Sequence, residues 1–182
     1  MKEKENNTFL ETKPHSSKAT KISTTKLIFI VIAVSLVLFF GVRFFMQNNN
    51  PQYGDYNQHE DAYFTERGSI IKNLKQAQED FNAKKYKEAI LNFEIVLKEY
   101  DKPEIRFFYG ISLLEENRFM DCETVFNKIK LGTSIYREKA TWYLALSNLK
   151  QKKMDECKIY LKQIPADAED YSQAQKLLKE LD

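Results

Sequence analysis

The sequence predicts an all-α protein: one membrane-spanning helix, then three helix–turn–helix repeats stacked as an α-solenoid, then a closing helix. Three observations lead to this fold class. The 182 residues include only 5 Gly and 4 Pro and are 30% charged, which is typical of helix-rich proteins. An uncharged apolar run occupies Leu27–Val42. After it, three stretches share one pattern of small and large apolar residues.

The apolar run is long enough to cross a membrane. Extended through Met46 it covers residues 27–46, which at about 1.5 Å per residue matches a hydrocarbon core of roughly 30 Å. No polar stripe interrupts the run, so a buried helix of a soluble core is the weaker interpretation. No small-x-small cleavage site follows it, which favours an uncleaved transmembrane helix over a signal peptide.

The flanking charges predict the orientation of this helix. Residues 1–26 form a basic tail with six Lys and three Glu, whereas residues 47–61 contain no Lys or Arg. The positive-inside rule then places 1–26 in the cytoplasm and the C-terminal domain in the periplasm or another extracytoplasmic space, as a single-pass protein of the inner membrane. A net charge of only +2 gives no reason to expect nucleic-acid binding.

Residues 47–68 are polar, contain Pro and Gly, and are predicted to be a flexible tether. His59, Glu60 and Asp61 lie there and have the residue types of a metal site, but solvated linker residues are the favoured interpretation. The chain has no Gly-rich phosphate loop and no nucleophile motif. We therefore expect no catalytic, metal-binding or cofactor-binding residues, and a protein that is not an enzyme.

The repeat is defined by pairs of small residues twelve positions apart. The three pairs are Ala77 and Ala89, Gly110 and Cys122, and Ala145 and Cys157. The second members are spaced by 33 and 35 residues, and large apolar residues recur at fixed offsets around them. Small side chains at these points would allow two helices to approach closely, so Gly110 and Cys122 are expected where one helix pair crosses.

This pattern resembles the tetratricopeptide repeat (TPR), a helix–turn–helix unit of 34 residues, and "AQEDFNAKKYKEAILNF" (77–93) is the closest copy. The resemblance covers residues 69–182. It implies antiparallel helix pairs at 69–83 with 85–99, 103–116 with 119–130, and 134–150 with 153–164. A seventh helix, 168–181, has one apolar face and would cap the last repeat.

The two cysteines occupy equivalent positions in successive repeats. Like helices of neighbouring repeats should be on the order of 10 Å or more apart, which exceeds the span of a disulfide. Cys122 and Cys157 are therefore expected to be small core residues, with a disulfide as the lesser alternative.

In the family that the chain resembles, the first helices of the repeats line a concave, protein-binding groove. The positions that this implies are Gln78, Phe107, Phe108, Ile111, Trp142, Tyr143 and Leu146. Their aromatic pairs could form an exposed patch that binds a peptide or a helix, or could pack partly within their own helix pairs. The family's Lys and Asn clamp for C-terminal carboxylates is not matched at Leu74 and Gln78.

These features predict a membrane-anchored, non-enzymatic adaptor of the bacterial cell envelope, whose partner is another protein. Two alternatives remain open. The domain could relay the binding of a partner to the cytoplasmic tail as a signalling protein. It could also self-assemble into a homo-oligomeric scaffold.

Overall fold

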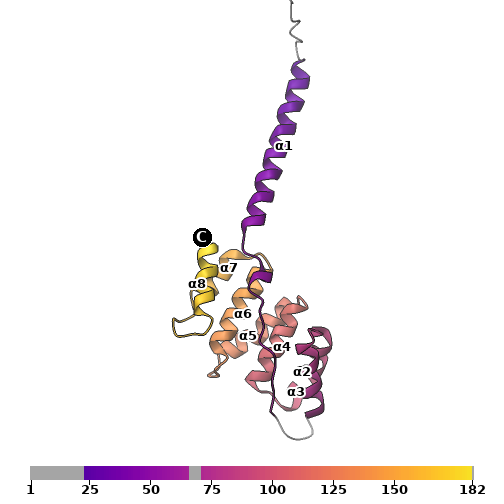
Figure 1. Ribbon diagram of the computed structural model, residues 1–182, viewed down its shortest axis with the longest axis vertical. Coiled ribbons are helices and arrows are strands. Elements are labelled where there is room, and N and C mark those ends of the chain that lie inside the picture. Colours follow the sequence, from indigo (N-terminus) through magenta and orange to yellow (C-terminus); the bar gives the residue numbers. More distant parts are fainter. Residues whose placement is uncertain (1–22, 66–70, 182) are drawn as a thin grey trace, which may run out of the picture. The chain divides into compact units, whose positions relative to one another are not determined.

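The computed structural model describes residues 23–65 and 71–181 (Figure 1). Within these residues the protein is all-helical, with eight α-helices, one 3-10 turn and no strand, as the sequence predicted. The chain divides into two compact units, Met1–Asn48 and Asn49–Asp182. Most of the predicted cytoplasmic tail, residues 1–22, lies outside the described residues.

The first unit contains one long apolar helix, α1 (Thr24–Asn49). Its Thr24–Phe44 stretch is long and apolar enough to cross a membrane, and its side chains are exposed along that length. The predicted span of 27–46 therefore lies inside one continuous helix. Ser35, the polar residue in the middle of the run, donates its hydroxyl to the Val31 carbonyl one turn earlier, so it leaves no free donor.

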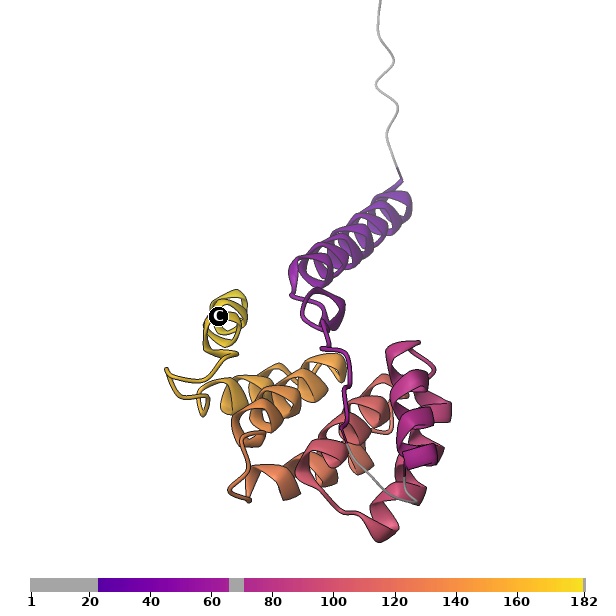
Figure 2. The ribbon, with the colours of Figure 1, turned by 60° about the horizontal axis from the view of Figure 1, so that its bottom comes forward.

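The second unit contains seven helices in chain order. They are α2 (Ile71–Asn82), α3 (Tyr86–Glu99), α4 (Pro103–Glu115), α5 (Phe119–Lys130), α6 (Arg137–Lys150), α7 (Met154–Leu161) and α8 (Tyr171–Glu180). Each of α2 to α6 packs against the next helix along the chain, as Figures 1 and 2 show. Pro103 begins α4, where its missing N–H costs nothing. The α7 helix ends at Leu161, earlier than the predicted 164, and the N–H groups of Gln163 and Ile164 donate to carbonyls three residues back. Ile164 precedes Pro165 and is disfavoured in a helix for that reason.

The same turn joins the helices within each pair. Lys84, Asn117 and Lys152 each have a φ near 60°, and they are spaced by 33 and 35 residues like the sequence repeat. After each of them the next N–H donates to a carbonyl five residues back: Lys85 to Asp80, Arg118 to Leu113, and Lys153 to Asn148. This is a Schellman helix end. The period read from the sequence is therefore also a period of the backbone.

Gly110 lies at a close crossing of α4 and α5. A Cβ atom at this position would be 2.8 Å from the ring of Phe126 and 3.1 Å from Val125, both on α5. The predicted close approach is confirmed, and the atoms nearest to this Cβ position belong to Phe126 and Val125. Phe126 lies one turn beyond Cys122 and directs its ring at the space that the missing side chain leaves.

Both cysteines are free thiols in the core, and neither is exposed. Burial raises the pKa of Cys157 to about 12, so the thiol stays protonated. The prediction of small core residues without a disulfide is confirmed.

Candidate functional site: the inner face and the segment that covers it

Residues 51–65, which we call the inner segment, lie across the faces of α6, α4 and α2, which we call the inner face (Figures 1 and 2). Tyr56 is 4% exposed and Ala62 is 1% exposed. The predicted flexible tether is therefore wrong for these residues. The segment is polar on average, but its ring-bearing residues have apolar surface to bury against the helices.

The N-terminal part of the inner segment binds through two tyrosines. The hydroxyl of Tyr53, in the 3-10 turn η1 (Tyr53–Asp55), donates to Glu115 Oε1 at 2.7 Å. The ring of Tyr56 packs edge-on against Trp142 at 6.1 Å, and its hydroxyl donates to Glu180 Oε2 on α8 at 2.6 Å. Burial, then the carboxylate of Glu115, raise the pKa of the Tyr53 phenol, so this hydroxyl remains a donor.

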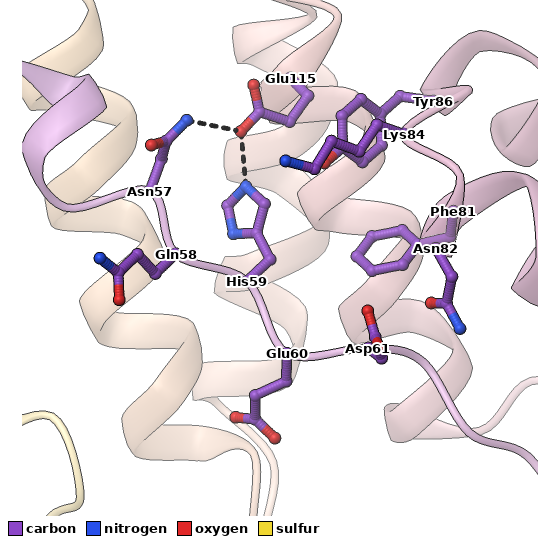
Figure 3. A pocket seen from close by; sticks show the side chains of 10 residues that line it. All are labelled: Asn57, Gln58, His59, Glu60, Asp61, Phe81, Asn82, Lys84, Tyr86 and Glu115. Carbon is purple, nitrogen blue, oxygen red and sulfur yellow. Dashed lines mark hydrogen bonds and ion pairs between the residues drawn. The ribbon is translucent and has the colours of Figure 1, made fainter.

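The centre of the segment is His59, whose ring points at Glu115 (Figure 3). Its Nε2 lies 2.5 Å from Glu115 Oε1, and its Nδ1 lies 3.0 Å from the hydroxyl of Tyr143. Only 7% of the His59 side chain is exposed, so the prediction of a solvated linker residue is wrong. Within the described ranges no group of three His, Cys, Asp or Glu side chains could hold a metal ion.

Glu115 is a carboxylate with donors on several sides. Lys150 Nζ lies 3.2 Å from its Oε2, and Tyr53, His59 and Asn57 approach its Oε1. Burial raises the pKa of this carboxyl, but the hydrogen bonds from His59 and Tyr53 and the charge of Lys150 outweigh burial and lower the pKa to about 2. Glu115 is therefore ionised at neutral pH, and its carboxylate accepts hydrogen bonds from donor groups of the segment.

The C-terminal part of the segment is held by its main chain. The amide of Asn82 binds both backbone groups of Ala62, accepting from its N–H at 2.7 Å and donating to its carbonyl at 3.0 Å. Gln78 Oε1 accepts from the N–H of Phe64 at 2.8 Å. The Phe64 ring packs edge-on against Phe108 at 5.5 Å and Phe93 at 6.2 Å. Side-chain amides thus recognise an extended backbone, whatever its sequence.

Lysines of the helices face an acidic segment. The inner segment contains Asp55, Glu60 and Asp61 and no Lys or Arg. Lys139 pairs with Glu60, Lys150 lies 4.5 Å from the centre of the Tyr53 ring, and Lys176 lies 5.6 Å from that of Tyr56. The attraction of cations to carboxylates and to ring faces favours an acidic, aromatic occupant.

The segment does not fill the inner face completely. A cavity of about 450 Å³ opens beside His59. Its walls on the helix side come from Phe81, Asn82, Lys84, Tyr86 and Glu115, which Figure 3 shows around the ring of His59.

The predicted groove residues divide into two groups. Gln78, Phe108, Trp142 and Tyr143 contact the inner segment through the bonds and rings described above. Phe107, Ile111 and Leu146 are buried among the helices, and the Phe107 ring packs against Phe126 at 6.0 Å and Tyr143 at 5.2 Å. The four aromatic residues of the predicted groove form no exposed patch, because all of them are less than 7% exposed: Phe107, Phe108, Trp142 and Tyr143.

Sequence reasoning missed Asn82, Glu115 and the inner segment itself. One signal in the sequence could have revealed the segment. Tyr53, Tyr56, His59 and Ala62 recur at every third position. A 3-10 turn such as η1 and an extended polyproline-like chain both have three residues per turn, so such a spacing places these side chains along one side.

Comparison of the chain with protein-family models, with curated proteins and with solved structures gave no match.

Proposed function

We propose that this chain is a membrane-anchored, non-enzymatic adaptor whose helical domain binds an extended segment of another protein on its inner face. One observation carries the proposal: the inner face already holds an extended segment, through contacts that recognise backbone, rings and charge. Asn82 and Gln78 bind main-chain groups, as a receptor for peptides must.

The proposed architecture is a TPR-like solenoid of three repeats with α8 as its cap. The recurrence of the same helix end at Lys84, Asn117 and Lys152 supports it, as does the close crossing at Gly110. In such a solenoid the first helices of the repeats line the concave side. Here α2, α4 and α6 contact the inner segment, which agrees with that arrangement.

In the proposed topology α1 spans the inner membrane and the helical domain lies in the periplasm or another extracytoplasmic space. The length and apolar composition of α1 support the span, and the excess of Lys in residues 1–26 supports the orientation. Protease treatment of intact spheroplasts tests it. Digestion of the domain is expected, and protection of the domain would reverse the topology.

Photo-crosslinking in living cells tests the proposed function. Tyr86 borders the cavity beside His59, so a photoreactive phenylalanine at this position keeps a ring at the inner face. Met120 is 83% exposed and is not among the residues around that cavity, and the same probe there is the control. We expect an adduct with a second protein from position 86 and none from position 120.

Other outcomes identify the alternatives. An adduct with twice the mass of the chain would favour self-assembly. Absence of any adduct from position 86, both in the wild type and in the variant Y56A/F64A, whose inner segment lacks two of its ring contacts, would contradict binding at this face. If the crosslink to the partner still forms after removal of residues 1–20, but the effect of partner binding on the cell is lost, the chain acts as a signalling protein.

A further inference from the structure

We propose that the inner segment is a built-in competitor for the inner face, and that the partner displaces it with an acidic, extended segment of the same chemistry. This chemistry is a Tyr or His ring with a hydrogen-bond donor at every third position, then a small residue, then Phe two residues later. The inference rests on the proposed function and adds both the class of partner and the regulation of the site.

The inner segment contacts the domain on one side only, as a bound peptide does. Its buried or half-buried members are mainly the residues at every third position, together with Pro51, Asn57 and Phe64. Its remaining side chains are exposed, and Tyr63, between two anchored residues, is 73% exposed. Departure of the segment uncovers the faces of α2, α4 and α6 that it contacts.

The helices retain their own partners when the segment leaves. Glu115 keeps its ion pair with Lys150, whose Nζ also donates to the Leu114 carbonyl at 2.8 Å. Lys139 likewise keeps its ion pair with Glu169, and Glu180 keeps Lys176. These three groups therefore stay paired, whereas an unpaired buried charge would make departure very costly. Asn82 and Gln78 regain water as a partner, at a small net cost per hydrogen bond.

The inner face specifies the chemistry of the displacing segment. Glu115 accepts hydrogen bonds from two groups six residues apart in the segment, the Tyr53 hydroxyl and the His59 imidazole. Glu180 accepts from the hydroxyl of Tyr56, midway between them. Lys139, Lys150 and Lys176 favour carboxylates and ring faces around them. The Ala62 position is fully enclosed, so a small side chain fits there, and the ring of Phe64 packs between Phe93 and Phe108.

A partner can also make contacts that the inner segment does not. The cavity of about 450 Å³ beside His59 is left open by the present occupant. A larger side chain near this position would bury more of the half-buried ring of Tyr86, which borders the cavity. Such a segment can outcompete an occupant that has the advantage of being attached to the same chain.

The test measures binding of a fluorescent peptide of residues 51–65 to the full-length protein in detergent micelles. In the wild type the attached segment competes with the peptide. In the variant Y56A/F64A the attached segment loses two ring anchors, whereas the helices are unchanged. We expect the variant to bind the peptide at least about tenfold more tightly than the wild type, because a tethered competitor acts at an effective concentration near millimolar.

Two controls match this experiment. The variant Y63A changes an exposed ring of the same segment and should bind the peptide as weakly as the wild type. A peptide that itself carries the Tyr56→Ala and Phe64→Ala changes should bind the Y56A/F64A protein at least about tenfold more weakly than the unmodified peptide does, because it lacks the two rings that the inner face buries. Added salt should weaken binding of the unmodified peptide, because Lys139 pairs with its Glu60 carboxylate.

Each contrary result overturns the proposal. Equal affinity of the wild type and Y56A/F64A would mean that the segment does not compete. No binding to either protein would mean that the inner face does not accept this chemistry from another molecule. Loss of helical circular dichroism in Y56A/F64A would make the segment a part of the core and not a removable occupant. Energy transfer between two labelled copies that the peptide abolishes would assign the occupant to a second copy of this chain.

These failures are distinguishable from failure of the proposed function. If the probe at Tyr86 gives an adduct in cells while the peptide experiment fails, the adaptor function stands and competition by the inner segment does not. If the peptide experiment succeeds but no adduct forms with the wild type or with Y56A/F64A, the segment is a competitor without a cellular partner.

Discussion

The Nε2 atom of His59 and the Oε1 atom of Glu115 lie 2.5 Å apart, although 56 residues separate them in the chain. This contact joins the middle of the inner segment to the end of α4. It also brings three donors of the segment to a carboxylate that the helices already pair with Lys150. The stability of the domain should therefore depend on the charge of Glu115.

Replacing Glu115 with Gln should destabilise the domain at neutral pH and remove one pH-dependent component of its stability. The folded-state pKa of about 2 lies below the ordinary value of 4.5. The carboxylate therefore contributes its full stabilisation above about pH 4.5 and loses it as the pH falls to about 2, a difference on the order of 3 kcal/mol.

Urea unfolding of the full chain, followed through the fluorescence of Trp142, its single tryptophan, measures this effect. The exposed neighbour Glu116, changed to Gln, controls for the loss of one charge. A wild type and an E115Q variant whose stabilities stay parallel from pH 7 to low pH would contradict the assigned role of Glu115.

Replacing Asn82 with Ala should loosen the C-terminal part of the inner segment. The change removes both hydrogen bonds to the backbone of Ala62, at a cost of about 1–2 kcal/mol. Hydrogen exchange of the Ala62 amide should become faster, while amides in the middle of α4 and α6 stay protected. Gln76→Ala, an exposed change in the same helix, is the control, and equal exchange in both variants would rule out the clamp.

Replacing Gly110 with Ala should destabilise the α4–α5 crossing. The new methyl group would lie 2.8 Å from the fully buried ring of Phe126, and overpacking of this kind costs about 1–3 kcal/mol. Up to about 1 kcal/mol is regained because Ala favours the helix more than Gly does. Gly54→Ala, where a Cβ meets nothing within 4 Å, is the control. Urea unfolding should separate the two variants, and an unchanged G110A midpoint would disprove the close crossing.

Replacing Lys152 with Gly should stabilise the domain by about 0.5–1 kcal/mol, because its φ of 60° favours a residue without a Cβ. Lys152→Asn, which introduces the residue found at the equivalent position 117, should give a smaller gain. The adjacent Lys153 has a φ of −92°, so Lys153→Gly should give no gain. Thermal unfolding ranks the three variants, and a gain in K153G equal to that in K152G would contradict this explanation.

Much of the fold could be predicted because its signals are local. The 33- and 35-residue spacings of the small residues predicted three helix pairs, and the helix ends at Lys84, Asn117 and Lys152 recur with the same spacings. Four of the seven predicted groove residues contact the inner segment, including Trp142 and Gln78. The prediction of a flexible tether was wrong because the composition of the segment averages over exposed polar residues and buried rings. Which of its residues are buried depends on their places along the segment, at every third position.

The sequence by itself determined an apolar helix long enough to cross a membrane and a helical domain with three repeated pairs. Helical periodicity, turn residues and apolar length act over a few residues, so they can be read without the fold. Only the tertiary structure decided that residues 51–65 cover the inner face. The Tyr56 hydroxyl meets Glu180 across 124 residues of sequence, and Asn82 binds Ala62 across 20. Such contacts depend on which surfaces the packed helices bring together. The spacing of rings at every third position marks the buried side of the segment, but it does not say which helices that side meets.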